Sequence, residues 1–173
     1  FQAVKYVFER GIMVGTSDTT FEPQSSVTRG QVVQMLYNLE GQPTVTGEDG
    51  FTDVQSKDWW YNAVVWASQN EVVSGYGDGT FQPKRNISRQ EFAQMLFNYA
   101  KFKGYDLTAT GDLTKFPDGG DVAGWAETAM QWANGNELIN GHADTGKLDP
   151  LGTTVRAQAA SILTKFHQTF VNP

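Results

Sequence analysis

The stretch that decides the fold is residues 75–96, which read GYGDGTFQPKRNISRQEFAQML. It opens with a glycine-rich loop and continues into apolar residues at helical spacing. The apolar positions fall at i, i+3, i+4 and i+7 and are Phe92, Met95, Leu96 and Tyr99. This period is that of a helix with one buried face, so the stretch predicts a loop followed by an amphipathic helix.

The same pattern occurs three times along the chain. The positions that match the loop and helix in the first copy are Gly15, Asp18, Phe21, Pro23, Val27, Arg29, Met35 and Leu36. In the third copy, with one residue inserted after the aspartate, they are Gly141, Asp144, Leu148, Pro150, Thr154, Arg156, Ile162 and Leu163. Repetition at this period is typical of a supersecondary unit that buries its apolar face only against its neighbours.

A first helix precedes the loop in each copy, so each unit reads as helix, loop, helix. In the middle copy that helix is predicted from Trp60, Ala63, Val64 and Ala67. The second helices repeat one apolar stripe, as Val32, Met35, Leu36 and Leu39 in the first copy and Ala159, Ile162, Leu163 and Phe166 in the third. Three equivalent stripes can meet at one axis, because a unit of this size buries too little area to stand alone.

The predicted fold class is therefore mainly α: three helix-loop-helix repeats in a pseudo-threefold arrangement around a central three-helix bundle. We place the repeats at residues 1–46, 47–110 and 111–173, together forming one globular unit. Residues 41–50 and 104–112, which are rich in Gly and Thr, are predicted to be the linkers between repeats.

The composition excludes several kinds of site. The 173 residues include no cysteine, which excludes disulfides and thiolate metal sites, and the formal net charge is −6. An acidic balance argues against broad binding to nucleic acid or to an anionic membrane surface. No apolar run approaches the roughly 18 residues that a membrane helix needs. We predict no cofactor.

The first copy is incomplete, because the chain opens inside its first helix and no Phe-x-Asp-Val segment precedes that helix. We expect Val4 and Val7 to be partly uncovered as a result. Two hypotheses follow: the chain is a fragment with further residues upstream, or a neighbouring chain covers this face.

The loop aspartates Asp18, Asp78 and Asp144 have two interpretations. Turn chemistry accounts for them, since glycine supplies positive φ and Asp bonds the nearby backbone. A calcium site is the alternative, although the spacing lacks the alternating ligands and terminal Glu of an EF-hand loop.

An arginine opens the second helix of every copy, as Arg29, Arg89 and Arg156. Capping boxes, Thr28 with Gln31 and Ser88 with Glu91, account for the residues around it. A cation at this end of a helix opposes the macrodipole, whereas free N–H groups and a guanidinium together suit a carboxylate or phosphate. Internal ion pairs, Arg89 with Asp53 or Arg156 with Asp118, are the alternative.

The tryptophans divide by position. Trp66 and Trp132 continue the apolar stripe of a first helix and are predicted to lie in the core. Trp59, Trp60 and Trp125 lie at the start of a first helix, where an indole can stack on a sugar or pack against the helix.

Taken together, the motifs resemble the S-layer homology (SLH) domain. They are Phe-x-Asp-Val, Trp-Tyr-x-Ala-Val, Gly-Tyr-x-Asp-Gly-Thr-Phe-x-Pro and Ile-Ser-Arg-Gln-Glu-Phe, and the resemblance covers nearly the whole chain. It implies a spindle in which each repeat gives one helix to a central bundle. It also implies that grooves between repeats bind secondary cell-wall polysaccharide, commonly through a terminal pyruvylated N-acetylmannosamine, and tether an extracellular protein to the bacterial cell wall or S-layer.

The resemblance also suggests which residues bind. The Thr-Arg-Ala-Glu motif of the family maps to residues 28–31, 88–91 and 155–158, and all three keep the arginine. The other positions implied are Asp53 and Asp118, the loop residues Gly75, Tyr76 and Gly77, and a groove tryptophan at Trp59 or Trp125. The first and third copies depart from the pattern, for example at Thr16, Val155 and His142. The groove around the middle copy is therefore the one we expect to bind, and Arg89→Ala is expected to lose binding to cell wall while keeping its fold.

Two other classes of function stay open. A glycosidase would need a carboxylate pair, such as Asp53 with Asp58 or Asp118 with Asp121. These lie in turn-like segments without a hydrolase, zinc or nucleotide-binding motif, and His142 and His167 fit loop or surface positions better than a base, so we predict no enzyme. The other alternative is a protein-interaction or accessory module of a larger secreted enzyme.

Overall fold

Six α-helices build the molecule in this computed structural model, which describes residues 2–17, 19–48 and 50–173. They are α1 Gln2–Glu9, α2 Arg29–Leu39, α3 Tyr61–Gln69, α4 Arg89–Lys103, α5 Glu127–Gly135 and α6 Arg156–Phe166. Short 3-10 turns, η1 Leu113–Lys115, η2 Gly119–Asp121 and η3 Gly124–Ala126, precede α5, and a π-helical turn, η4 His167–Val171, follows α6. The described part of the chain forms isolated β-bridges but no strand. The mainly α prediction is confirmed.

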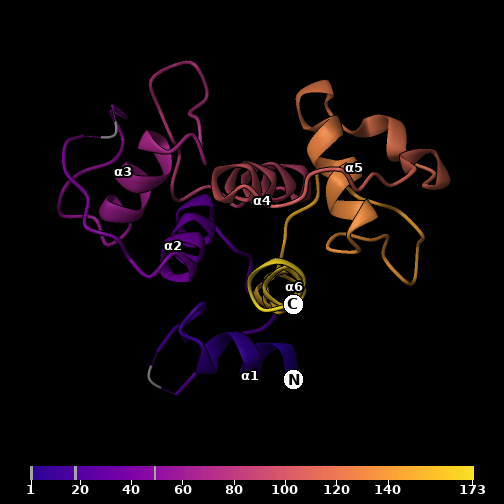
Figure 1. The fold of residues 1–173 in the computed structure, drawn as a ribbon, viewed down its shortest axis with the longest axis horizontal. Coiled ribbons are helices and arrows are strands. Elements are labelled where there is room, and N and C mark those ends of the chain that lie inside the picture. Colours follow the sequence, from indigo (N-terminus) through magenta and orange to yellow (C-terminus); the bar gives the residue numbers. More distant parts are fainter. Residues whose placement is uncertain (1, 18, 49) are drawn as a thin grey trace.

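The second helices of the three copies, α2, α4 and α6, lie around the centre, and α1, α3 and α5 lie outside them (Figure 1). The predicted stripes face inward: Leu36, Leu96 and Leu163 are fully buried. Each of these helices presents one apolar face, so the three faces share a single core.

The outer helices pack on the central helix of the preceding copy. α3 packs on α2, α5 on α4, and α1 closes the ring by packing on α6. The sequence repeats and the packed helix pairs are thus offset by one helix. Each copy is held by its neighbours, which joins the three into one body.

A ring of backbone hydrogen bonds surrounds the pseudo-threefold axis. Val27 N–H donates to Thr154 O at 2.8 Å, Thr154 N–H to Ile87 O at 3.4 Å, and Ile87 N–H to Val27 O at 2.9 Å. These three residues hold equivalent positions just before α2, α4 and α6, and all are fully buried. The ring sets the starts of the three central helices against one another.

The Phe-x-Asp segments pack onto the loops of their own copies. The ring of Phe51 lies 5.4 Å from that of Phe81, and a Cβ on Gly75 would come within 2.7 Å of the Phe51 ring. In the first copy the equivalent place is a hollow of about 290 Å³ between α1 and the loop, lined by Val4, Phe8 and Phe21 among others. Val4 is partly exposed, as expected, but Val7 is fully buried, because it faces the core and not this hollow.

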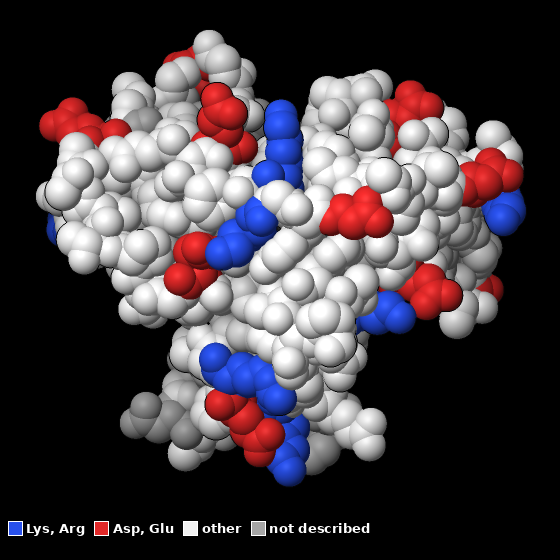
Figure 2. Space-filling model, in the orientation of Figure 1, with Lys and Arg blue, Asp and Glu red and all other residues white. Residues whose placement is uncertain are grey.

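No helix in the described residues is long and apolar enough to span a membrane. Acidic and basic side chains lie in small scattered groups on the face shown in Figure 2, and they form no continuous basic patch among the described residues there.

Candidate functional site: three grooves between repeats

The three helix-opening arginines are nearly buried, with exposed fractions of 5% for Arg29 and Arg89 and 4% for Arg156. Each reaches into the loop of the next copy and donates from Nε and Nη2 to two backbone carbonyls. Arg89 donates to Leu148 O at 2.8 Å and to Asn140 O at 2.6 Å. The other pairs of acceptors are Phe81 O and Ser74 O for Arg29, and Phe21 O and Val14 O for Arg156.

The helix starts offer no free N–H groups at these arginines, contrary to expectation. Arg29 N–H donates to Arg85 O at 2.9 Å and Gly30 N–H to Pro83 O at 2.8 Å, and both other helices repeat this pattern. The predicted capping boxes use the third N–H in α2 and α4. The neighbouring copy therefore takes up the first two N–H groups of each central helix, and these groups are not free to bind a ligand.

Asp53 and Asp118 each accept hydrogen bonds from the backbone of the loop in their own copy. The Asp53 carboxylate accepts from Phe81 N–H and Gln82 N–H at 2.8 Å each, and Asp118 accepts from Leu148 N–H and Asp149 N–H at the same distance. Burial works against the charge of Asp118, but the two N–H donors outweigh it and hold its pKa below the usual value. The suggested ion pairs of Asp53 with Arg89 and of Asp118 with Arg156 do not form between these described residues.

Turn chemistry accounts for Asp78, whose Oδ1 accepts from both the N–H and the hydroxyl of Thr80. These bonds lower its pKa. Asp144 is exposed, and Asp18 lies outside the described residues. The described part of the chain contains no group of three or more acids or histidines able to hold a metal ion.

Three of the four carboxylates considered for glycosidase chemistry, those of Asp53, Asp58 and Asp118, accept hydrogen bonds from backbone N–H groups. Asp53 holds its loop, and Asp58 accepts from Gln55 N–H at 2.8 Å. His142 Nε2 lies 3.5 Å from Asp149 in an open loop, and His167 bonds the hydroxyl of Tyr6 at 3.1 Å.

Three grooves run between the copies, and each has one of the arginines in its wall. The Arg29 groove, of about 500 Å³, is lined by Arg29, 72–76, Glu91, Gln94, Met95, Asn98 and Trp125. The Arg156 groove, of about 390 Å³, is lined by Arg156, 12–16, Gln31, Gln34, Met35, Asn38 and Trp59. The Arg89 groove, of about 290 Å³, is lined by Arg89, 138–140, Ala157, Gln158, Ser161 and Ile162.

The Arg29 and Arg156 grooves each draw residues from all three copies. The Arg156 groove joins an arginine of the third copy, a loop and helix of the first, and a tryptophan of the second. The pairing of copies into grooves could not be predicted from the sequence.

The five tryptophans fall into two classes, buried and exposed, and the prediction that Trp66 and Trp132 lie in the core is confirmed. Trp66 and Trp132 are buried. Trp59 and Trp125 are exposed by 58% and 59%, one in the wall of each large groove. Trp60 is buried, its ring centroid lies 4.8 Å from that of Trp59, and its ring lies next to Gly30 of α2.

The loop residues Gly75 and Tyr76 line the Arg29 groove, whereas Gly77 does not. Gly77 has φ of +79°, and its role is in the turn. Asp53 and Asp118 line none of the three grooves, so any part they play in binding is indirect, through the loops that they hold.

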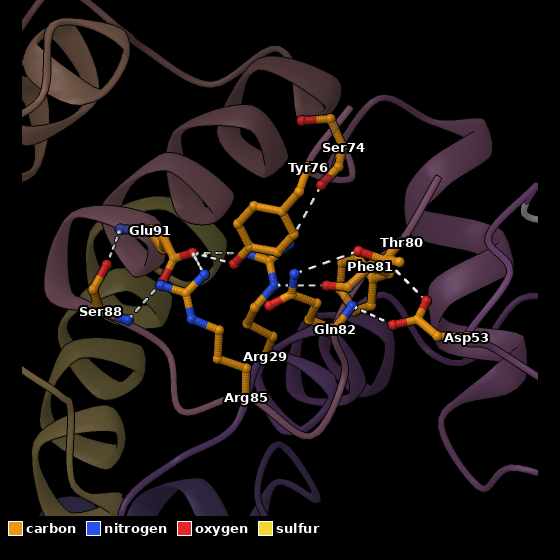
Figure 3. A network of polar contacts seen from close by, with 10 residues as sticks. All are labelled: Arg29, Asp53, Ser74, Tyr76, Thr80, Phe81, Gln82, Arg85, Ser88 and Glu91. Carbon is orange, nitrogen blue, oxygen red and sulfur yellow. Dashed lines mark hydrogen bonds and ion pairs between the residues drawn. The ribbon is translucent and has the colours of Figure 1, made fainter. Parts of the chain in front are cut away.

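Glu91 is a groove residue that sequence reasoning placed only in a helix cap. Its Oε2 accepts from Ser88 N–H at 2.8 Å, and its Oε1 accepts from Arg29 Nη1 at 3.2 Å and from the Tyr76 hydroxyl at 2.5 Å (Figure 3). Arg85 Nη1 lies 3.8 Å from the same oxygen. The signal available in the sequence was a charged Glu at a position where the other two copies carry Gln31 and Gln158.

The network fixes the charge states in the Arg29 groove. Burial disfavours the charge of Glu91, but the hydrogen bonds from Tyr76 and Ser88 outweigh it and lower its pKa. Burial and the bond to Glu91 raise the pKa of Tyr76 to about 12. Glu91 is therefore an anion and Tyr76 a neutral donor at neutral pH.

Comparison with known proteins agrees with this architecture. The family model described as "S-layer homology domain" matches residues 1–33 and 50–93. The chain belongs to the S-layer homology family. Residues 111–173, which the family model does not match, follow the same order of helix, loop and helix. Membership of this family, together with surface-layer and anchoring relatives, indicates a location at the cell surface or in the cell wall.

Relatives of this SLH chain are much longer proteins. It is 30% identical to an endoglucanase of Bacillus sp. (strain KSM-635) over 94% of this chain and 17% of the relative. It is 26% identical to a surface-layer 125 kDa protein of Lysinibacillus sphaericus, over 95% of this chain and 14% of the relative. It is 24% identical to a cellulosome-anchoring protein of Acetivibrio thermocellus, over 84% of this chain and 33% of the relative. The match to the enzyme covers a region of this chain's size, so it implies no catalytic activity here.

Proposed function

We propose that this SLH unit anchors a larger surface protein to the bacterial cell wall by non-covalent binding of a secondary cell-wall polysaccharide in its inter-repeat grooves. The end unit of the glycan is proposed to be a pyruvylated N-acetylmannosamine. The observation that carries the proposal is a groove built twice on one plan, with a buried guanidinium in its wall and an exposed tryptophan beside it.

This combination suits an acidic sugar. An indole face packs against the apolar face of a sugar ring, while the amide side chains along the central helix supply donors and acceptors for hydroxyl groups. A pyruvate ketal keeps its carboxylate, and a guanidinium binds carboxylates with charge-assisted hydrogen bonds of roughly 1.5–3 kcal/mol each. The names of the relatives, a surface-layer protein and a cellulosome-anchoring protein, support anchoring as the purpose.

Co-sedimentation with purified cell wall tests the proposal. We expect the chain to sediment with native wall and to remain in solution with wall from which pyruvate has been removed. The double variant Trp59→Ala/Trp125→Ala should lose sedimentation and keep its circular dichroism spectrum, because both indoles are more than half exposed. Leu151→Ala is the matched control, since Leu151 is exposed by 67% and lies outside the three grooves.

Equal binding of the wild-type chain to native and pyruvate-free wall would contradict the acidic-sugar proposal. Failure to bind either wall, together with capture of a defined protein partner by the same grooves, would favour an interaction module instead. Binding by one groove is expected to be modest, and several occupied grooves or many anchors on one cell would supply avidity.

A further inference from the structure

The two exposed groove tryptophans sit on equivalent turns. Trp59 and Trp125 lie two residues before the outer helices α3 and α5, and each lines the wall of one large groove. An indole that is more than half exposed gains little positional restraint from packing. The backbone turn that carries it must therefore set its position, and what holds each turn decides how far each groove is ordered before a ligand arrives.

The turn at Trp59 is held by the two residues beside it. Asp58 precedes it, and its Oδ2 accepts from Gln55 N–H at 2.8 Å, which closes the turn. Trp60 follows it and is buried, and a Cβ on Gly30 of α2 would lie 3.5 Å from the Trp60 ring. The Trp59 and Trp60 rings meet edge to face, with centroids 4.8 Å apart. The segment around Trp59 thus supplies its own support.

The same two supports are missing at Trp125. The residues equivalent to Asp58 and Trp60 are Gly124 and Ala126, which offer neither a carboxylate nor a ring. The 3-10 turn η3, which carries Trp125, has no side-chain cap of its own among the described residues. This turn therefore depends on a contact from outside its own segment.

Gln90 makes that contact. Its Oε1 accepts from Ala123 N–H at 2.9 Å, and Ala123 is the N-cap of η3, whose carbonyl accepts from Ala126 N–H at 2.8 Å. Gln90 is the second residue of α4, on which η3 packs, and it is only 4% exposed. Its own N–H donates to Pro150 O at 3.0 Å. The acceptor is thus fixed by burial and by its backbone, so it can hold the start of the turn that carries Trp125.

The copies differ at this position in a matched way. The residues equivalent to Gln90 are Gly30 in the first copy and Ala157 in the third. Where the central helix has Gly30, the outer segment packed on it has the large Trp60; where it has Gln90, the outer segment has the small Ala126. The sizes are complementary in both helix pairs. One groove tryptophan is therefore steadied by packing and the other by a hydrogen bond from the central helix.

We propose that Gln90 is a positioning residue for the Arg29 groove: it fixes η3 on α4 and thereby holds the Trp125 indole in the groove wall. This rests on the proposed function, in which that indole packs on a sugar ring. Gln90 is not among the residues that line the three grooves, so it acts through Trp125 and not on the ligand. An indole held in place before binding need not be ordered during binding, which strengthens the complex.

The first measurement needs no ligand. The heteronuclear NOE of each indole N–H reports the order of that ring, and the signals are assigned with the Trp59→Phe and Trp125→Phe variants. Gln90→Met has a similar length but no acceptor, so it should lower the NOE of Trp125 and leave that of Trp59 unchanged. Gln90→Glu keeps an oxygen acceptor and should restore the wild-type value. Asp58→Ala is the matched control, since it removes a bond beside Trp59 and should spare Trp125.

The second measurement is groove-selective binding. The probe is the methyl glycoside of N-acetylmannosamine carrying a pyruvate ketal, titrated while both indole signals are followed. We expect Gln90→Met to weaken binding at Trp125 by about fivefold, the effect of having to order one side chain on binding, and to leave binding at Trp59 unchanged. Gln90→Glu should bind as the wild-type chain does. Thermal melting checks that each variant is folded at the temperature of the titration.

An unchanged Trp125 NOE in Gln90→Met, or an equal loss of binding at both indoles, would overturn the inference. If the glycoside shifts the Trp59 signal of the wild-type chain but not that of Trp125, Trp125 is not held for a sugar, and the inference fails while the anchoring function stands. If the NOE responds as expected but the wild-type chain binds neither wall nor glycoside, the positioning by Gln90 stands and the proposed function fails.

Discussion

An arginine at the first position of a helix stands against the helix dipole, and here three of them are also buried. Their acceptors resolve the conflict: each guanidinium donates to two carbonyls in the loop of the neighbouring copy. The same side chain therefore joins two copies and forms part of a groove wall. A residue with both roles is a poor target for testing binding alone.

We accordingly expect Arg89→Ala to destabilise the chain by about 3 kcal/mol, because two charge-assisted bonds are lost and two carbonyls are left unpaired. Loss of wall binding by this variant would therefore not separate a binding role of Arg89 from its structural role. Urea unfolding followed by tryptophan fluorescence measures the loss. Arg85→Ala is the control, since its side chain is half exposed and its loss should cost less than about 1 kcal/mol. Equal midpoints for the two variants would contradict the structural role.

Thr154 carries a buried hydroxyl in the axial ring where the other copies have Val27 and Ile87. Its Oγ1 has no hydrogen-bond partner among the described residues. Thr154→Val has nearly the same shape and removes an unsatisfied polar group, so we expect about 1 kcal/mol of added stability. A thermal midpoint at or below that of the wild-type chain would show that the hydroxyl is satisfied in solution.

At the scale of single elements, Gly75 and Gly77 in the loop of the middle copy are needed for different reasons: Gly75 for space and Gly77 for its backbone conformation. A Cβ at Gly75 would lie 2.5 Å from Thr80 O and 2.7 Å from the Phe51 ring, whereas Gly77 has open space and a φ of +79°. Gly77→Ala should cost about 1–2 kcal/mol for the left-handed backbone. Gly75→Ala should cost more, because backbone and a packed ring must both move. Differential scanning calorimetry of the two variants gives the order, and the reverse order would contradict the packing described.

Local elements were predictable because their signals are local. The apolar stripes, the capping boxes at Thr28 and Ser88, and the Asp78 turn depend on residues a few positions apart, and the structure confirms them. The partners of the arginines were not predictable, because Arg156 meets the carbonyl of Phe21 across most of the chain. Trp59 and Trp125, which the sequence suggested as groove residues, lie in the walls of two grooves, but the sequence does not encode which copies meet to form each groove.

At the scale of the whole molecule, the offset packing makes the repeats interdependent. Helix α3 of the second copy packs on α2 of the first, and α4 packs on α5 of the third. We therefore expect an isolated fragment of residues 47–110 to show no cooperative thermal transition by circular dichroism, whereas the whole chain melts in one transition. A fragment that melts cooperatively at the same concentration would show that each sequence repeat folds alone.

The closure of the ring by α1 and α6 brings the two ends of the chain to one seam (Figure 1), where Tyr6 bonds His167 and Thr164 bonds Ala3 O. A mechanical load applied between the ends would peel these contacts apart one after another. The Arg156 groove crosses the same seam, since it joins α6 to the loop of the first copy. A glycan bound there would hold both sides together, so we expect an attached anchor to resist unfolding under tension better than a free one.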